Sequence, residues 1–300
     1  MTLASKVLMV EPEHFQVNPE IVSDNFFVSQ TSFPNEELKA IVRKEFEGLK
    51  SKLTKAGIEV VSFQPYFQVP APDAVFPNNW FSTHTDGTLV IYPMMSPLRR
   101  NERHTEILKY LKGIYRDVID LSSNENQSRF LEGTGSIVIN HSNKIAFASE
   151  SARTNSILFY EWCERMKHTP VLFHATDENG RPIYHTNVML TIAENIAIIC
   201  MECIRDEREQ KLVRENLLKC GLKIFEINFE QVKCFSGNTL ALINKSGEQI
   251  LAVSEQGWKG LNEQQRKFLL NHCAEIIIAP LTNIEACGGG SARCMIAELY

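Results

Sequence analysis

The stretch Gly57-Ile58-Glu59-Val60-Val61 joins the end of an amphipathic helix to a short β-rich run, and this junction recurs along the chain. Four further β-rich runs also follow a helical pattern: Asp117–Asp120, Pro170–Phe173, Lys223–Glu226 and Glu275–Ile278. One marker from each run (Val60, Val118, Leu172, Phe225 and Ile277) gives successive steps of 58, 54, 53 and 52 residues. A near-constant step indicates a repeated structural unit.

The helix before the first run is well defined by its sequence. It begins after Pro34-Asn35 with Glu36 and Glu37 in its first turn, where acidic side chains suit the helix dipole. Its apolar positions recur at helical spacing along one face: Leu38, Ile41 or Val42, Phe46, Leu49 and Leu53. Gly57 is placed to end this helix. The same pattern predicts a helix from roughly Asp206 to Cys220.

Paired apolar runs separated by turn residues lie between these helix–strand junctions. They predict β-hairpins over residues 80–92, 136–147, 188–199 and 239–253. A fifth hairpin is predicted between residues 290–299 and 6–11, near the two ends of the sequence. Each repeat is therefore a hairpin, a helix and a strand, and units that cannot bury their faces alone must close on one another. We expect one ring-like α/β domain over residues 1–300.

Composition and charge indicate an ordinary globular protein. The chain has 44% hydrophobic and 22% charged residues and a formal net charge of −5, and neither sign forms a long run. We therefore expect neither a nucleic-acid partner nor a membrane partner, because both need a basic patch. No signal peptide or membrane span is visible, so the eight cysteines are expected to be thiols in the cytoplasm. The sequence leaves the oligomeric state open, a homo-oligomer included.

Two short patterns resemble a metal site and a nucleotide site, and neither is convincing. Cys200-Met201-Glu202-Cys203 has zinc-like spacing, but it has no second pair and strand alternation would separate its thiols. Gly288–Gly290 lacks the Lys-Ser/Thr sequence that follows in a phosphate-binding loop. We expect no metal and no other cofactor.

If the ring closes, the segments that start the first strand of each hairpin converge on its centre. These segments are residues 76–79, 131–135, 184–187, 235–238 and 288–294. They bring together one carboxylate, one imidazole and one thiol, Glu132, His185 and Cys294, which are 53 and 109 residues apart in sequence. Amide side chains accompany them, among them Asn238.

Each of these three residues taken alone has a plainer explanation. A cysteine is usually a small buried apolar residue, a histidine in an apolar run usually forms a hydrogen bond in the core, and a glutamate before glycine usually lies in a surface turn. Their coincidence at equivalent repeat positions favours a catalytic site. Only Cys294 has a glycine-rich approach, which lets backbone N–H groups come close to a bound group.

The segment Ala286–Met295, ACGGGSARCM, resembles the nucleophile segment of the guanidine-modifying superfamily. That superfamily includes arginine deiminases, dimethylarginine dimethylaminohydrolases, amidinotransferases and succinylarginine dihydrolase. Further segments resemble its other motifs in the same order: Asp73–Asn79 its first substrate-binding motif, Leu131-Glu132-Gly133 its glutamate motif and His185-x-Asn187 its His-x-Asp motif. The resemblance covers almost the whole chain and is nearest to the bacterial citrulline-utilisation hydrolases. It implies a five-bladed α/β propeller (pentein), in agreement with the five repeats.

The resemblance also implies a role for each matching residue. Cys294 would be the nucleophile, His185 the acid/base, and Glu132 the carboxylate that holds the planar head of the substrate. Further substrate contacts would come from the first motif and from the amides: Asp73, Phe76, Asn78, Asn79, Asn187 and Asn238. Three arginines, Arg99, Arg100 and Arg153, resemble those that hold the substrate α-carboxylate in the dimethylarginine branch. For each of them a solvated surface arginine is the alternative.

Two departures from the superfamily pattern bear on the substrate. Deiminases generally carry aspartates where this chain has Asn79 and Asn187. Asparagine offers both a donor and an acceptor, which match the NH₂ and C=O of a neutral ureido group. Buried carboxylates would instead suit a cationic guanidinium. The sequence therefore favours a cysteine-dependent hydrolase that converts citrulline to ornithine, ammonia and carbon dioxide through a covalent adduct.

Two other kinds of function stay open at this point. One is arginine or methylarginine deimination, or amidino transfer to a second amine, on the same catalytic residues. The other is a non-catalytic binding protein built on the same ring, since a fold does not dictate a function. Such a protein would have no need of a thiol, an imidazole and a carboxylate at three equivalent positions.

Overall fold

Five small sheets make up the fold of the computed structural model, which describes residues 3–29 and 35–300. Each sheet has three strands within these residues. The sheets are β15(Ala297–Leu299)–β1(Lys6–Val10)–β2(Glu59–Phe63), β3(Phe81–Thr83)–β4(Thr88–Ile91)–β5(Asp117–Asp120), β6(Ile137–Asn140)–β7(Ile145–Ser149)–β8(Thr169–Phe173), β9(Leu190–Ile192)–β10(Ile196–Ile199)–β11(Lys223–Glu226) and β12(Leu240–Ile243)–β13(Gln249–Ser254)–β14(Glu275–Ala279). In each sheet the middle strand is antiparallel to its hairpin partner and parallel to the strand after the helix.

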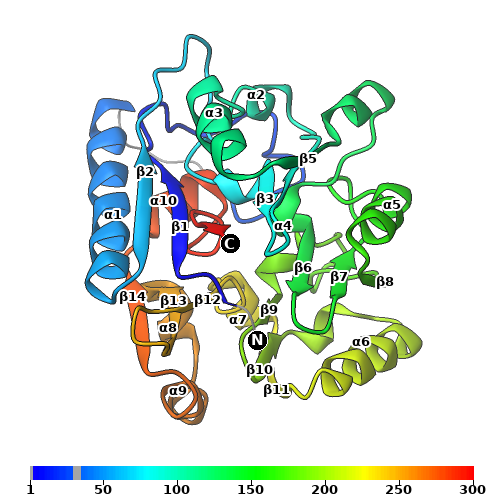
Figure 1. Cartoon of the computed structure of the whole chain (residues 1–300). Helices are drawn as coiled ribbons and strands as arrows, with labels where there is room; N and C mark the ends of the chain where they lie inside the picture. The colour runs from blue at the N-terminus through cyan, green and yellow to red at the C-terminus, as the bar shows by residue number, and fades with distance from the viewer. Residues whose placement is uncertain (1–2, 30–34) are drawn as a thin grey trace.

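Strands from near the two ends of the sequence meet in the first sheet. Val7 of β1 pairs with Glu298 in the antiparallel direction and with Val60 in the parallel direction, as the fifth predicted hairpin requires. The sheets surround a common centre, with the larger helices outside them (Figure 1). The predicted closed arrangement of five α/β units is therefore confirmed. That residues 1–300 form one domain stays a prediction.

The helices outside the sheets are α1 (Asn35–Lys55), α3 (Thr105–Ile114), α5 (Ser156–Met166), α6 (Glu207–Lys219), α8 (Glu255–Gly260) and α9 (Glu263–Leu270). Two of them, α1 and α6, are the helices that the sequence predicted. The stripe of α1 is buried against the sheets: Leu38, Val42, Phe46, Leu49 and Leu53 are each at most 1% exposed. Burial of each such side chain contributes about 1.5–3 kcal/mol, so this face holds α1 in place.

Short helical turns, rather than strands, form most of the segments that converge on the centre. The elements that precede the first strands of the hairpins are η1 (Pro77–Asn79), α4 (Gly133–Ser136), η3 (Thr186–Val188), α7 (Phe229–Lys233) and α10 (Thr282–Gly288). Proline, glycine and asparagine within three of them favour turns over strands. The sequence located these segments but gave them the wrong local structure.

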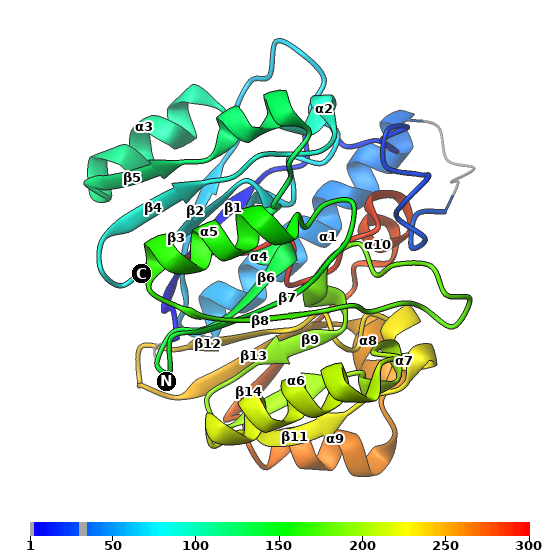
Figure 2. The same cartoon turned by 90° about the vertical axis from the view of Figure 1, so that its right-hand side faces the viewer.

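One end of the molecule gathers the short helices that surround the candidate site. Figure 2 shows α7, α10 and α2 (Pro97–Arg100) at this end and both chain ends on the opposite side. Two further short turns, η2 (Ser122–Gln127) and η4 (Met201–Cys203), follow β5 and β10. Because all five units point their connecting turns the same way, residues distant in sequence can share one cavity.

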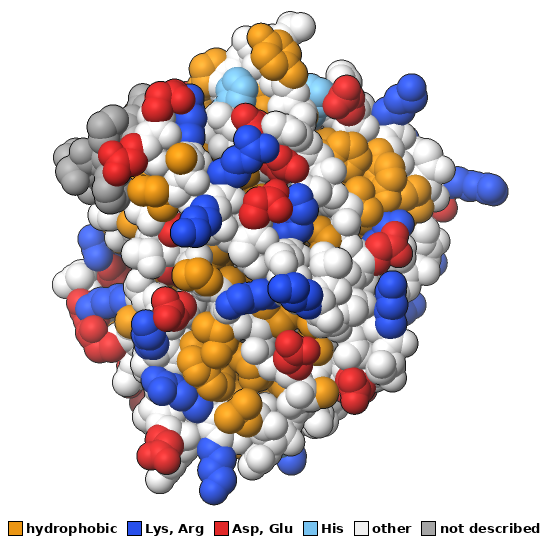
Figure 3. Space-filling view, turned by 90° about the vertical axis from the view of Figure 1, so that its left-hand side faces the viewer, with side chains coloured by type: hydrophobic (Ala, Val, Ile, Leu, Met, Phe, Trp, Pro, Cys, Tyr) orange, Lys and Arg blue, Asp and Glu red, His pale blue; other side chains and the backbone are white. Residues whose placement is uncertain are grey.

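The surface seen in Figure 3 mixes charged side chains of both signs. Lys and Arg alternate there with Asp and Glu, and this face presents no broad basic patch for a polyanion. Among the helices of the described residues, none is long and apolar enough to cross a bilayer. None of the eight cysteines is part of a disulfide.

Candidate active site

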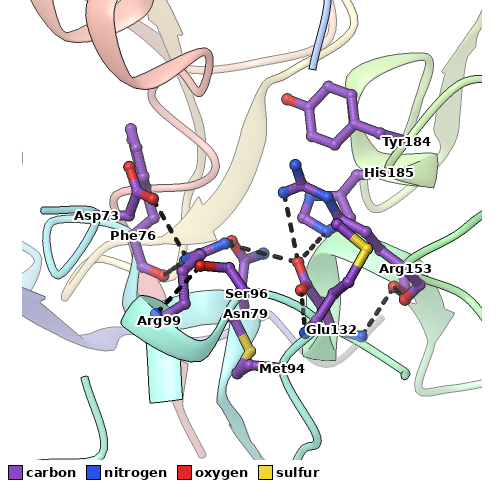
Figure 4. A network of polar contacts seen from close by, with 12 residues as sticks. Asp73, Phe76, Asn79, Met94, Ser96, Arg99, Glu132, Arg153, Tyr184 and His185 are labelled. Atoms are coloured by element: carbon purple, nitrogen blue, oxygen red, sulfur yellow. Dashed lines mark hydrogen bonds and ion pairs between the residues drawn. The ribbon is translucent and has the colours of Figure 1, made fainter. Parts of the chain in front are cut away.

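Glu132 and His185 form a buried pair where two neighbouring units meet. Glu132 directly precedes α4, and His185 directly precedes η3. Nε2 of His185 lies 2.8 Å from Oε2 of Glu132, and both residues are at most 1% exposed (Figure 4). The backbone N–H of Met95 donates to Oε1 of the same carboxylate at 3.0 Å. The carboxylate is therefore held at both of its oxygens.

Two arginines keep Glu132 ionised. Nη1 of Arg99 and Nη1 of Arg153 each lie 3.6 Å from its Oε2. Burial raises the pKa of Glu132, but Arg153, His185 and Arg99 together outweigh burial and hold that pKa well below its usual range. Burial lowers the pKa of His185, the two arginines lower it further, and Glu132 raises it; the resulting value is about 4. At neutral pH a neutral imidazole therefore donates its Nε2–H to the carboxylate, and Nδ1 keeps its lone pair.

The depressed pKa of His185 predicts a loss of stability in weak acid. The ordinary value is 6.5 and the folded value is about 4, so between these values the unfolded chain binds a proton that the folded protein excludes. The stabilising contribution is present above about 6.5 and is lost as the pH falls towards 4, and it amounts to about 3 kcal/mol.

Urea unfolding of the wild type and of His185→Gln across this pH range measures that contribution. Titrating groups that do not contact His185 are common to both proteins, so they cancel when the two unfolding free energies are subtracted. Glu132 contacts His185, but Arg153 and Arg99 still lower its pKa in the variant. The difference should shrink as the pH falls. A difference that stays constant with pH would contradict the assignment of a neutral His185.

Cys294 lies in the turn that follows α10 and the three glycines. Its backbone N–H donates to the carbonyl of Ser291, and the residue is 2% exposed. Two amide groups face the sulfur: Nδ2 of Asn238 lies 3.4 Å from Sγ, and Nδ2 of Asn187 lies 3.7 Å from it. Both amides can therefore donate to the sulfur when it carries negative charge.

Glycines allow close approach on two sides of the cavity. A Cβ on Gly135 of α4 would lie 2.8 Å from Nδ1 of His185, so the helix reaches the imidazole only because this residue lacks a side chain. Gly289 has a φ of +63°, in the left-handed region that glycine adopts readily. A Cβ there would overlap the side-chain amide of Asn25. The glycine-rich segment before Cys294 therefore serves close packing.

A second polar cluster holds Asp73, Asn79 and Arg99 beside Glu132. The guanidinium of Arg99 donates to both oxygens of Glu102 at 2.7 and 3.1 Å, and to Oδ1 of Asn79 at 2.9 Å. Its Nε also lies 3.8 Å from Oδ2 of Asp73. Among the described residues, Oδ1 of Asp73 and Nδ2 of Asn79 are buried without a hydrogen-bond partner. Such unsatisfied groups are suited to a bound ligand.

The structure places Phe76 in the cavity and leaves Asn78 and Arg100 outside it. The ring of Phe76 lies so close to Gly288 that a Cβ there would be 2.7 Å from it. Nδ2 of Asn78 donates to the hydroxyl of Thr134 at 3.3 Å. Arg100 donates to two backbone carbonyls and lies 3.4 Å from a glutamate that is not in the cavity. We therefore leave Asn78 and Arg100 out of the proposed site.

Residues 11–29, here called the covering segment, lie over the cavity. Nδ2 of Asn18 donates to Oδ2 of Asp73 at 2.7 Å, and Nδ2 of Asn25 donates to the carbonyl of Gly289 at 3.2 Å. No motif in the sequence of this segment assigns it to the site. The one available signal was its length without a helix or strand pattern, which is common in binding loops.

Arg153 and Tyr184 complete the wall next to the covering segment. Nε and Nη2 of Arg153 donate to the two carboxylate oxygens of Asp24 at 2.6 and 2.9 Å. The guanidinium carbon lies 5.0 Å from the ring centroid of Tyr184. The Tyr184 hydroxyl donates to the carbonyl of Gly289 at 2.5 Å. Tyr184 also lines the cavity, although no sequence motif assigned it to the site.

These side chains line a narrow cavity of about 10 Å³, roughly the room that one water molecule needs. Its lining residues are Ile21, Asn25, Asp73, Phe76, Asn79, Arg99, Arg153, Tyr184, His185, Gly288, Gly289, Gly290 and Cys294. The thiol and the imidazole therefore face the same space. A larger cavity of about 440 Å³ shares Tyr184 with it, but none of the three predicted catalytic residues lines that cavity.

The match to a known family agrees with this geometry. Residues 11–300 match the model of the family described as N,N dimethylarginine dimethylhydrolase, eukaryotic. The chain belongs to this family. The description of this family is that of a hydrolase acting on a guanidino compound, which agrees with the guanidine-modifying superfamily that the sequence predicted. No curated protein matches the chain.

Solved structures with the same fold extend over nearly all of this chain. ArgZ, an arginine dihydrolase from the ornithine–ammonia cycle in cyanobacteria, has a TM-score of 0.77 at 15% identity. The match covers 97% of this chain and 40% of the ArgZ chain. A cysteine-to-alanine mutant of AgrE with L-arginine has a TM-score of 0.75 at 16% identity, and the match covers 98% of this chain and 40% of the AgrE chain. This chain thus spans about 40% of the length of ArgZ and AgrE.

A third structure matches over its whole length. A cysteine-to-serine mutant of DDAH from Pseudomonas aeruginosa, complexed with citrulline, has a TM-score of 0.69 at 15% identity, with 99% of this chain and 100% of that chain covered. Identities this low show the fold alone, which is the five-bladed α/β propeller that the family resemblance implied and that agrees with the five repeats.

Proposed function

We propose that this family member hydrolyses the ureido group of citrulline to give ornithine, ammonia and carbon dioxide. The observation that carries the proposal is the shared cavity of Cys294 and His185, with ionised Glu132 bonded to the imidazole. The three residues come from three different units of the propeller. No purely structural requirement brings a thiol, an imidazole and a carboxylate together there.

The first step forms a bond between the Cys294 sulfur and the ureido carbon. The thiol proton leaves to a base, for which the Nδ1 lone pair of neutral His185 is available. As the C–NH₂ bond breaks, the imidazolium returns that proton to the departing nitrogen, and ammonia leaves. An S-carbamoyl adduct, Cys–S–C(=O)–NH–R, remains. Glu132 stabilises the imidazolium in this step, and its fixed position orients the ring.

The second step releases the adduct with water. His185 takes a proton from the water as its oxygen attacks the adduct carbon, the C–S bond breaks, and the thiol is restored. The product R–NH–COOH loses carbon dioxide to leave the amine of ornithine. One citrulline and one water thus give one ornithine, one ammonia and one carbon dioxide. The steps use side chains and water alone, so we keep the prediction that no metal or other cofactor takes part.

The amides in the site favour a neutral ureido head over a guanidinium. Asn187 and Asn238 both place an amide beside the Cys294 sulfur. The unpaired Nδ2 of Asn79 can donate to a ureido oxygen, whereas a guanidinium has no acceptor to offer it. The related ArgZ is an arginine dihydrolase, so arginine is the substrate that the test must separate from citrulline.

A product assay on five compounds tests the proposal. Citrulline, arginine, dimethylarginine, agmatine and succinylarginine are each incubated with the enzyme and with Cys294→Ala as the blank. Ammonia, ornithine and carbon dioxide in equal amounts from citrulline are the expected result. Citrulline accumulating from arginine, with citrulline itself left intact, would refute the ureido assignment and favour a deiminase.

The double substitution Asn79→Asp with Asn187→Asp is expected to move the preference from citrulline towards arginine. It places two carboxylates where a neutral head would meet them unpaired and a guanidinium would pair with them. We expect the ratio of kcat/KM for arginine to kcat/KM for citrulline to rise about 100-fold. Asn179→Asp, at an exposed amide outside the cavity, is the matched control. An unchanged ratio in the double variant would refute the charge argument.

A further inference from the structure

Arg153 already holds a carboxylate, and that carboxylate belongs to the covering segment. Asp24 accepts from Nε and Nη2 of Arg153 at 2.6 and 2.9 Å, which is the bidentate geometry of an arginine bound to a free carboxylate. Arg153 is 1% exposed, and the Asp24 side chain is 21% exposed. A buried guanidinium therefore meets an acid that is close to solvent.

Arg99, the other arginine of the cavity, is bonded to a different carboxylate. Its Nε and Nη2 donate to Glu102, which is 1% exposed and lies three residues further along the chain. Its Nη1 donates to Asn79. Arg99 is thus paired with a residue three positions along the chain, whereas the fork of Arg153 is paired with Asp24 of the covering segment. An α-carboxylate that enters the cavity must therefore compete with Asp24.

The volume of the cavity is also relevant. About 10 Å³ is far too little for an amino acid with a five-carbon chain, so side chains that line the cavity, Ile21 and Asn25 of the covering segment among them, shift when the substrate binds. Glu20 anchors that segment elsewhere, because it accepts from the Ser96 hydroxyl at 2.5 Å and from the Leu98 backbone N–H at 3.0 Å. The segment is thus held at Arg153, at Asp73 and Gly289 beside the cavity, and at Ser96 and Leu98.

We propose that Asp24 is a specificity-determining residue that occupies the site of the substrate α-carboxylate on Arg153. A substrate with an α-carboxylate replaces Asp24 on the guanidinium and recovers the lost charge pair. An amine without that carboxylate leaves Asp24 on Arg153 when the segment closes again. The inference rests on one part of the proposed function, namely that the substrate is an amino acid with an α-carboxylate. It does not depend on whether the other end of the substrate is a ureido or a guanidino group.

Binding measurements in the Cys294→Ala background test this competition without turnover. Dissociation constants are measured for citrulline and for 4-ureidobutylamine, which is citrulline without its carboxylate, and likewise for arginine and agmatine. Asp24→Asn should tighten binding of the carboxylate-bearing member of a pair about tenfold, the equivalent of one charge-assisted pair. Binding of the decarboxylated member should change by less than about twofold.

Glu20→Gln is the matched control, because it loosens the covering segment without freeing Arg153. It should change the two members of each pair by the same factor. Equal changes in Asp24→Asn, or weaker binding of citrulline and arginine, would overturn the competition. If arginine and not citrulline binds while the tail selectivity changes as stated, the ureido assignment fails and the role of Asp24 stands.

Discussion

Replacing Cys294 with alanine is expected to lower kcat by at least about 10⁴-fold, because Cys294 is the one thiol among the residues that line the cavity. The thiol is buried and faced by two amides, so its removal takes away the nucleophile and leaves the surrounding packing in place. Stability should change little, since the substitution removes one sulfur atom from a small side chain. Steady-state kinetics on citrulline, with urea unfolding alongside, measure both quantities.

Cys234→Ala is the matched control for this experiment. Cys234 is half-buried, and thus more accessible than Cys294, and it lies outside the catalytic cavity. Its loss should leave kcat unchanged. Mass spectrometry of the wild type during turnover should find the carbamoyl adduct on the peptide that contains Cys294. Full activity in Cys294→Ala, or an adduct on another cysteine, would exclude the proposed nucleophile.

Glu132→Gln is expected to damage both catalysis and stability. The carboxylate accepts from His185 and lies 3.6 Å from two buried guanidinium groups. Without it the imidazolium formed during the reaction loses its partner, and we expect kcat to fall by about 10²–10⁴-fold. Arg99 and Arg153 lose a shared counter-charge in a buried site, so the free energy of unfolding should fall by about 3–5 kcal/mol.

A buried carboxylate away from the cavity separates these two effects. Glu45 is 8% exposed and accepts from the backbone N–H groups of Asn283 and Ile284 at the start of α10. Glu45→Gln should lower the free energy of unfolding with little effect on kcat. If Glu132→Gln behaved in the same way, with stability reduced and kcat kept, Glu132 would be a structural residue only.

The sequence by itself determined the architecture of this protein. Five β-rich runs at steps of 52 to 58 residues require five similar units, and an α/β unit with one apolar face is stable only when its neighbours cover that face. The closing strand pair between β1 and β15 follows from that repetition, as does the meeting of Glu132, His185 and Cys294. Equivalent positions of repeated units converge whatever their separation along the chain.

Other features of the site depend on directions and contacts that a sequence pattern does not carry. Arg99 and Arg100 are neighbours on α2, and successive side chains on a helix point about 100° apart, so only the placement of the helix decided that Arg99 faces the cavity. The covering segment has no periodic signal, because its partners lie far away in sequence: Asn18 bonds to Asp73 and Asp24 bonds to Arg153. Such contacts exist only once the ring has closed, and they decide how the cavity is shut and which carboxylate occupies Arg153.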